Sequence, residues 1–358
     1  MSETNPLTRR AASNLEAVKM DLAASYAQGN DERATLLQTL LSCAGKILLY
    51  RPQLQHYAVL FGDLDAARHV VLVVPGVGDG TNMCDDWIPG ATNLYVAAPD
   101  TAVVLWKGYD NPVDLFNAAT ESIECDADLM TAGSDLVAFV DWLDLSADQS
   151  LTVVAHSFGS VITGTALADY GLRCTDVVVA GSPGMTVDEL RQLHVDEAHF
   201  FSEKAPGDTV ADLGIFGAAP TSSTFGGTRM QTNAPGHEPV LAHAHYFERG
   251  SEALDNMVAV VTGRYRDVNR HPWSVPEVAG SLVCWTLRLP TMPLRVVGRH
   301  YRGPGFRVMV NAMRACDLGA AQTGNVVREA LDEGERALAW VVRRVGGTWT
   351  PFDANEGS

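Results

Sequence analysis

The sequence predicts an α/β fold in which helices cover both faces of a mostly parallel β-sheet. Short apolar, β-branched runs alternate with helix-like stretches from about residue 55 onward. These runs are continuously apolar, as expected for strands that are buried on both faces. The chain has 358 residues, of which 46% are hydrophobic and 19% are charged, so it suits one large globular domain with additions.

Six strands are expected in this core. They are placed at 57–61, 69–74, 101–106, 150–155, 176–180 and 198–202. The helices between them are expected at about 82–90, 126–144, 158–171 and 187–193, with a last core helix at 252–261. Catalytic residues in such folds lie on loops at the carboxyl ends of the strands, so a site is expected at that edge.

Helical segments are expected on both sides of the core, which spans 55–263. Residues 1–54 are predicted to form an N-terminal helical arm, and 264–358 a mostly helical extension or cap with a long amphipathic helix at about 323–345. Apolar residues recur at helical spacing in this arm and are expected to share one face of its helices. They are Leu15, Val18, Leu22, Tyr26, Leu36, Leu37, Leu40, Leu41 and Leu48.

Composition excludes several classes of function. A net charge of −17 argues against non-specific nucleic-acid binding. The six cysteines are scattered without a CxxC pair, so neither a disulfide framework nor a metal site is expected, and no cofactor is implied. We see no secretory signal and no spanning segment, and we therefore expect a cytoplasmic protein.

The stretch 264–318 is unusual because it carries nine arginines against three acidic residues. Two interpretations stay open. Basic charge interleaved with Trp273, Trp285 and Leu282 fits a lid, or a surface that touches an anionic membrane peripherally. Alternatively, these arginines pair with the acidic core within a helical subdomain.

A nucleophile is predicted at Ser157. The apolar run 151–155 leads through His156-Ser157-Phe158-Gly159 into a helix-compatible stretch. A serine on a sharp strand-to-helix turn needs small neighbours two residues before and after it, and Ala155 and Gly159 supply them. His156 is expected to pack under the turn.

An oxyanion site requires preorganised backbone donors. The amide of Phe158, at the start of the following helix, is one expected donor. The other is the amide of Val77, because the run 71–75 ends in a glycine-rich loop with Gly76 and Gly78. This loop lacks the spacing of a nucleotide-binding motif.

The orienting acid should follow a later strand, and the base should follow the acid. Asp208 lies in a Pro-Gly-Asp turn after the sixth strand and is the expected acid, with Glu203 and Asp212 as competitors. His243 and His245 precede the last core helix, where the base belongs, and the residues alone do not choose between them.

Two other histidines bear on the choice of base. His237 also follows the acid, whereas His199 lies inside the sixth strand and is expected to be a packed strand residue.

At these residues the chain resembles an actinobacterial α/β-hydrolase family that is catalogued as a domain of unknown function. The likeness covers about 35–263 and rests on the stretches 73–78, 106–112, 156–160, 179–184, 206–208 and 243–247. It implies the α/β-hydrolase fold and a Ser-Asp-His triad, and it favours His243 over His245 because the family's histidine stands three residues before a tyrosine. Ala155 and Ala242 depart from the family, which usually has glycine there.

We therefore predict a serine hydrolase that cleaves a small-molecule or lipid ester, as carboxylesterases and lipases do, through an acyl-enzyme at Ser157. Thioesterase, peptidase or phospholipase chemistry on the same triad, and a non-catalytic binding or assembly module, are the alternatives. Gly76, Gly78, Tyr109 and Asp110 are candidate pocket residues. The oligomeric state is not predicted.

Overall fold

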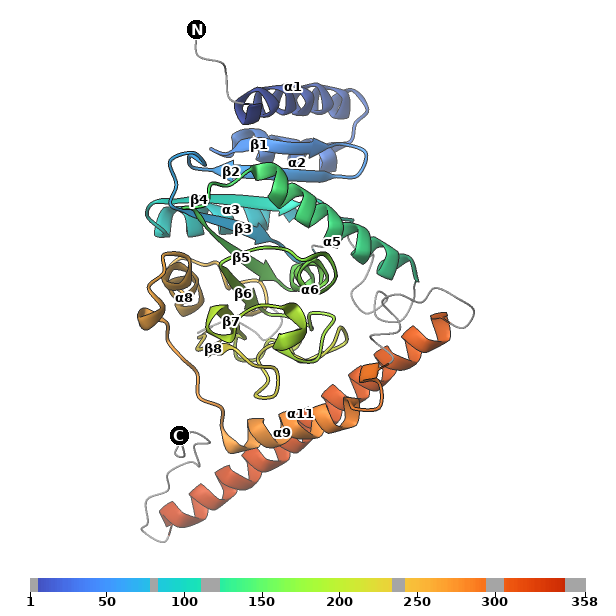
Figure 1. Cartoon of the computed structure of the whole chain (residues 1–358), viewed down its shortest axis with the longest axis vertical. Helices are drawn as coiled ribbons and strands as arrows, with labels where there is room; N and C mark the ends of the chain where they lie inside the picture. The colour runs from blue at the N-terminus through green and yellow to red at the C-terminus, as the bar shows by residue number, and fades with distance from the viewer. Residues whose placement is uncertain (1–5, 78–82, 111–122, 234–241, 294–305, 345–358) are drawn as a thin grey trace.

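The computed structural model describes residues 6–77, 83–110, 123–233, 242–293 and 306–344. Its centre is an eight-stranded sheet with the strand order β1-β2-β4-β3-β5-β6-β7-β8 (Figure 1). β2 pairs antiparallel with β1 and β4, and every other neighbouring pair is parallel. The predicted α/β fold with a mostly parallel sheet is confirmed.

The strands are β1 (Lys46–Arg51), β2 (His56–Phe61), β3 (His69–Val74), β4 (Thr101–Lys107), β5 (Ser150–His156), β6 (Asp176–Ala180), β7 (Phe200–Glu203) and β8 (Thr228–Met230). The helices are α1 (Pro6–Ala27), α2 (Asp31–Ser42), α3 (Met83–Ala97), α5 (Ile123–Leu143), α6 (Phe158–Tyr170), α8 (Glu252–Val261), α9 (Val275–Arg288) and α11 (Phe306–Arg344). Short 3₁₀ turns lie at η1 (Leu190–Leu193), η2 (Glu197–His199) and η3 (Tyr265–Asp267).

The core has two apolar layers, one on each face of the sheet. Successive side chains of a strand point to opposite faces, so in β3 Val70 and Leu72 pack toward α5 and α6 whereas Val71 and Val73 pack toward α3 and α8. Burial on both faces explains why the central positions of these strands are largely apolar. Packing in these two layers holds the strands in place, and the site residues follow the carboxyl ends of these strands.

The N-terminal helical segment is shorter than predicted because residues 46–51 form the edge strand β1. Leu48, which we assigned to the helical stripe, lies in that strand and is buried. The α2 helix ends at Ser42, and the chain then crosses the sheet edge at Gly45, where a Cβ atom would lie 2.2 Å from the Val59 side chain. This close approach requires glycine there and turns the chain into β1.

Other boundaries also differ from prediction. Strand β8 was not expected, since three residues with partly exposed side chains leave a weak pattern. The expected helix at 187–193 is only the 3₁₀ turn η1, and α11 begins at Phe306 rather than at about 323. His199 lies in η2, ahead of β7, and is hydrogen-bonded to Asp176 at 2.8 Å.

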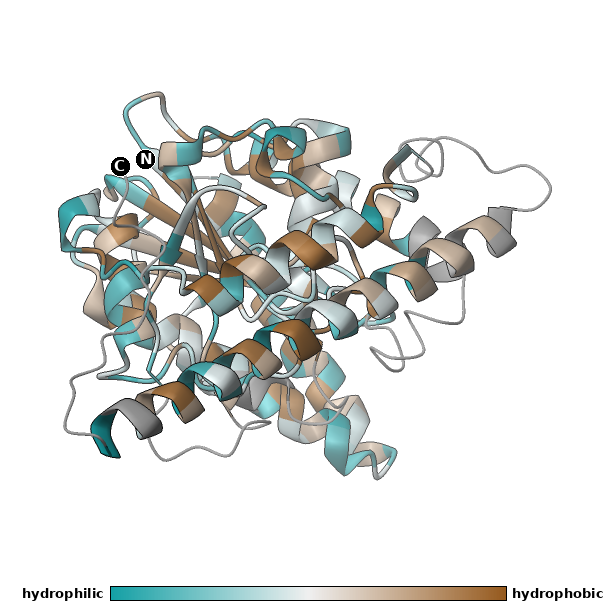
Figure 2. Cartoon of the chain, turned by 90° about the horizontal axis from the view of Figure 1, so that it is seen from below, coloured by the Kyte–Doolittle hydropathy of each residue, from teal (hydrophilic) through white to brown (hydrophobic). Residues whose placement is uncertain are grey.

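The α9 and α11 helices run antiparallel, side by side, below the sheet, and we call them the C-terminal helix pair (Figure 1). They approach closely at Gly280 and Gly324, since a Cβ atom on either would lie 2.6 Å from the other's carbonyl oxygen. Figure 2 shows the pair from below, with hydrophobic residues along both helices. Among the described residues, no helix is both long and apolar enough to span a membrane.

Candidate active site

The turn between β5 and α6 places Ser157 at the carboxyl end of a central strand. Ser157 has φ 50° and ψ −127°, a strained conformation for a residue with a side chain. Gly159 lies so close to β3 that a Cβ atom would be 2.2 Å from the carbonyl oxygen of Val74. Ala155, where the resembled family usually has glycine, is buried within the layer that faces α5 and α6. The turn therefore keeps the strained geometry of a nucleophile elbow.

Ser157, His243 and Asp208 form one continuous hydrogen-bonded chain. The Ser157 Oγ lies 2.9 Å from Nε2 of His243. Nδ1 of the same ring lies 3.0 Å and 2.9 Å from the two carboxylate oxygens of Asp208. With Nδ1 donating to the carboxylate, Nε2 is the unprotonated nitrogen that can accept the serine proton. The three predicted residues are thus brought together from β5, the turn after β7 and the loop before α8.

Asp208 is fully buried, and its carboxylate is surrounded by donors. Oδ1 accepts hydrogen bonds from the amides of Val210 at 3.0 Å and Ala211 at 3.1 Å, and Oδ2 accepts one from the Tyr246 hydroxyl at 2.6 Å. Burial by itself would raise the pKa of Asp208, but His243, Tyr246 and the Ala211 amide outweigh it and lower that pKa to about 2. The carboxylate therefore remains ionised beside the imidazole.

His156, the residue before the nucleophile, is enclosed on all sides. Its Nε2 donates to the carbonyl oxygen of His243 at 2.7 Å, and its ring lies 4.6 Å from the His243 ring and 4.8 Å from the Trp87 ring between centroids. Burial lowers its pKa to about 3, and the nearby His243 adds to the effect. His156 is therefore neutral and links the nucleophile turn to the loop that carries the base.

The loop after β3 lies against the nucleophile. A Cβ atom on Gly76 would be 2.7 Å from Cβ of Ser157, so glycine allows the Gly76–Val77 backbone to approach the reacting oxygen. The hydroxyl of Tyr109 lies behind this loop, hydrogen-bonded to the carbonyl of Pro75 and 3.2 Å from that of Gly76. Phe158 begins α6 directly after Ser157, and Val77 directly follows Gly76, so the two expected oxyanion donors lie on segments that meet at Ser157.

The remaining candidate pocket residues lie in different surroundings. Tyr109 is 3% exposed, which makes it a support of the loop rather than a wall open to a ligand. Asp110 is exposed and accepts a hydrogen bond from the His56 ring at 2.9 Å. Gly78 and His237 lie outside the described residues.

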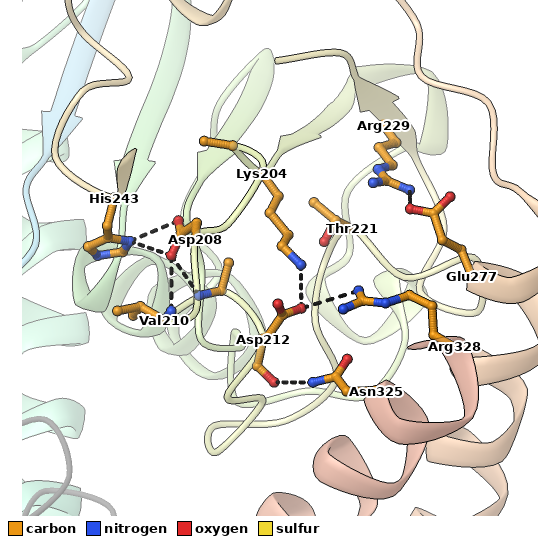
Figure 3. A network of polar contacts seen from close by, with 12 residues as sticks. Lys204, Asp208, Val210, Asp212, Thr221, Arg229, His243, Glu277, Asn325 and Arg328 are labelled. Carbon is orange, nitrogen blue, oxygen red and sulfur yellow. Dashed lines mark hydrogen bonds and ion pairs between the residues drawn. The ribbon is translucent and has the colours of Figure 1, made fainter. Parts of the chain in front are cut away.

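The competitors for acid and base are engaged elsewhere. Glu203 is buried in β7 without a hydrogen-bond partner among the described residues, and burial raises its pKa well above the ordinary value. His245 pairs with Glu248, one turn along its own loop, instead of facing Ser157. Asp212 contacts Lys204 on the side of the turn that faces away from His243 (Figure 3).

Sequence reasoning missed two supporting residues. Gly181, at the end of β6, has φ 59°, and a Cβ atom there would lie 2.9 Å from Oδ2 of Asp208 and 3.0 Å from Nδ1 of His243. Tyr246 binds Asp208 through its hydroxyl, which also accepts the amide hydrogen of Ala205 at 2.8 Å. The available signal for Gly181 was a glycine directly after β6, the strand next to β5. The signal for Tyr246 was a tyrosine three residues after His243.

The turn that carries Asp208 also contacts the C-terminal helix pair (Figure 3). Asp212, four residues later, binds Lys204 and lies 3.6 Å from Nη1 of Arg328 on α11. The carbonyl of Asp212 accepts a hydrogen bond from Asn325 at 3.4 Å. No group of three or more metal-binding side chains is found in the described part of the chain.

The chain is similar to known proteins over much of its length. Residues 52–218 match a family model described as alpha/beta hydrolase. An uncharacterized protein of Mycobacterium bovis is 33% identical over 215 residues, which cover 54% of this chain and 77% of that protein. The chain belongs to the alpha/beta hydrolase family. An uncharacterized protein of Mycobacterium tuberculosis is 28% identical over 247 residues, which cover 58% of this α/β-hydrolase and 37% of that relative. The chain thus spans little more than a third of that relative's length.

Solved structures with a similar arrangement include hydrolases. A thermostable esterase from Pseudomonas putida is 11% identical with a TM-score of 0.40, covering 75% of this chain and 99% of that one. A cutinase from Trichoderma reesei is 17% identical with a TM-score of 0.33, and the match covers 55% of this chain and 76% of the cutinase. At these identities and scores the likeness does not bear on the substrate.

Proposed function

We propose that this α/β-hydrolase cleaves an ester through an acyl-enzyme formed on Ser157. The observation that supports this proposal is the unbroken chain from Ser157 Oγ through His243 to Asp208, with all links between 2.9 and 3.0 Å. A hydroxyl becomes an effective nucleophile when a base can take its proton as it attacks.

In the first half of the reaction, the Ser157 oxygen attacks the ester carbonyl carbon while Nε2 of His243 takes the hydroxyl proton. The negative charge that develops on the carbonyl oxygen is stabilised by the amides of Val77 and Phe158. His243 then gives the proton to the departing alkoxide, and the acyl group remains on Ser157. Asp208 stays ionised, since its pKa is about 2, and stabilises the imidazolium throughout.

In the second half, water attacks the acyl carbon as His243 accepts one of its protons. Collapse of this intermediate breaks the bond to Ser157, returns the proton to its oxygen and releases the carboxylic acid. Gly181 leaves room for the Asp208–His243 pair, and His156 holds the backbone of His243 near the nucleophile.

A series of p-nitrophenyl esters with increasing acyl-chain length tests the proposal and ranks the substrates. Wild type should turn over at least one of them, and Ser157→Ala should abolish that turnover. Ser146→Ala, a change in an exposed loop serine, is the matched control and should retain full activity. Equal turnover by wild type and Ser157→Ala would refute the assignment, and no turnover across the series would favour the non-catalytic alternative.

A further inference from the structure

A second pocket lies between the C-terminal helix pair and the loops that follow β7. It offers a volume of about 90 Å³ to the centres of water-sized molecules, and it opens to solvent. Residues from α9, α11 and 204–229 line it, and none of the three triad residues does. We call it the helix-pair pocket.

Basic side chains predominate among the charged residues that line this pocket. Lys204, Arg229, Arg288 and Arg328 are the cations, and Asp212 and Glu277 are the carboxylates. Arg229 pairs with Glu277 at 2.8 Å. Lys204 and Arg328 share the single carboxylate of Asp212. Burial lowers the pKa of Lys204, Asp212 opposes this shift, and smaller repulsions from Arg328 and Arg229 add to it.

Two carboxylates that do not line the pocket reduce its excess of positive charge. Asp317 lies 3.7 Å from Nε of Arg288, on a residue that does not line the pocket. Asp332 interacts electrostatically with Arg328 but is also absent from the lining.

One of these cations, Arg288, has buried donors without a hydrogen-bond partner among the described residues. Arg288 is 1% exposed, and although its Nη2 donates to the carbonyl of Gly214 at 2.5 Å, its Nε and Nη1 have no hydrogen-bond partner among the described residues. The side chain of Arg328 is partly exposed, and its Nη1 lies 3.6 Å from Oδ1 of Asp212, an ion pair longer than a hydrogen bond. Buried donors are almost always satisfied by protein, water or a ligand, so an acceptor is expected in this space.

The rest of the lining combines apolar side chains with uncharged polar ones, which come from Thr221, Ser222, Thr224, Ser281 and Asn325. Trp273 and Trp285 contribute aromatic side chains, and Trp273 is anchored by a hydrogen bond from its Nε1 to the carbonyl of Thr221 at 3.1 Å. Cys284 and Ala321 line the same space from the two helices. The helix-pair pocket thus combines a group of cationic donors with two tryptophan side chains that can contact hydrocarbon.

We propose that the helix-pair pocket binds an amphiphilic anion, a carboxylate or phosphate group attached to an apolar body, at a site separate from the catalytic centre. The anionic group accepts hydrogen bonds from Arg328 and Arg288, for which planar guanidinium donors are well suited. The apolar body packs against Trp273 and Trp285. Arg328 and Lys204 also bind Asp212, which lies four residues after Asp208. The proposed ligand would therefore lie next to the turn that carries Asp208.

Isothermal titration calorimetry with octanoate and with octyl phosphate tests this proposal, and the tighter binder identifies the head group. Wild type and the control Arg336→Gln, an exposed arginine two turns further along α11, should bind equally. Arg328→Gln should weaken binding at least tenfold, as should replacing the probe by octan-1-ol. Ser281→Phe fills the pocket without changing its charge and should also abolish binding, and thermal melting verifies that each variant is folded.

The proposal does not depend on the hydrolase reaction. Treatment with a fluorophosphonate that blocks Ser157 should leave octanoate and octyl phosphate binding unchanged. If neither probe binds wild type, if Arg328→Gln binds as tightly as Arg336→Gln, or if blocking Ser157 abolishes binding, the proposal is wrong.

Discussion

Replacing His156 by glutamine should make the stability of the protein less dependent on pH. In the wild type, the buried neutral ring donates from Nε2 to the carbonyl of His243. A glutamine amide at position 156 can keep that donor, but it has no proton to take up between pH 4 and 7. At neutral pH the variant should lose about 1–3 kcal/mol, because the packing of the ring against Trp87 is lost.

The magnitude follows from the pKa of His156, which burial lowers from 6.5 to about 3. Below pH 6.5 the unfolded chain protonates this histidine and the folded protein does not. The stability contribution is therefore complete above pH 6.5 and declines as pH falls, by about 1.4 kcal/mol per pH unit. Between pH 6.5 and 4.0 the wild type should lose about 3 kcal/mol that the glutamine variant does not lose.

Guanidinium unfolding, followed by tryptophan fluorescence at pH 7.0, 6.5, 5.0 and 4.0, measures both proteins. Other shifted groups titrate equally in the two proteins, including Asp176 and Glu203, so the difference between the two curves isolates His156. A difference that stays constant from pH 6.5 to 4.0 would show that the folded protein protonates His156 readily and that the buried neutral ring is wrong.

Four further substitutions probe the triad and its supports, the first three by kcat with an active ester and the last by the free energy of unfolding. His243→Ala should lower kcat at least 10³-fold and His245→Ala less than threefold; the reverse ranking would assign the base to His245. Gly181→Ala should lower kcat at least tenfold, because its methyl group would meet both Asp208 and His243 at 2.9–3.0 Å, and an unchanged kcat would contradict that contact. Tyr246→Phe should cost about 1–3 kcal/mol in free energy of unfolding, because a buried carboxylate and an amide lose their partner, and a loss below 0.5 kcal/mol would contradict this account.

The strands of the core could be predicted from the sequence because their residues are buried on both faces. The run of β-branched residues in β3 is an example, since no helix or exposed strand favours such a pattern. The edge strand β1 could not be predicted in this way, because its leucines continue the leucine-rich pattern of α2. Only the close passage of Gly45 over Val59, a contact between distant parts of the sequence, ends the helical region there.

In the candidate site, too, some features could be predicted from the sequence and others could not. The order of Ser157, Asp208 and His243 along the chain follows from the fold, and the structure brings these three together. The choice between His243 and His245 could not be made from the residues, because two positions in one loop differ only in where their side chains point. The structure turns the first toward Ser157 and the second toward Glu248.

The supports of the site and the helix-pair pocket were beyond sequence reasoning for a related reason. Gly181 matters because its missing side chain leaves room for two residues that come from other loops. The pocket joins 204–229 to α9 and α11, so its cations are separated in the sequence by more than 120 residues at the extremes, Lys204 and Arg328.

Labelling with a fluorophosphonate probe, followed by peptide mass spectrometry, tests the central claim most directly. A phosphonate reacts with a serine only when a neighbouring base activates its hydroxyl, so labelling reports the Ser157–His243 pair independently of the natural substrate. We expect one label on the peptide that contains Ser157, and none on Ser157→Ala. Equal labelling of the two proteins, or no labelling of the wild type, would contradict the claim that Ser157 is an activated nucleophile.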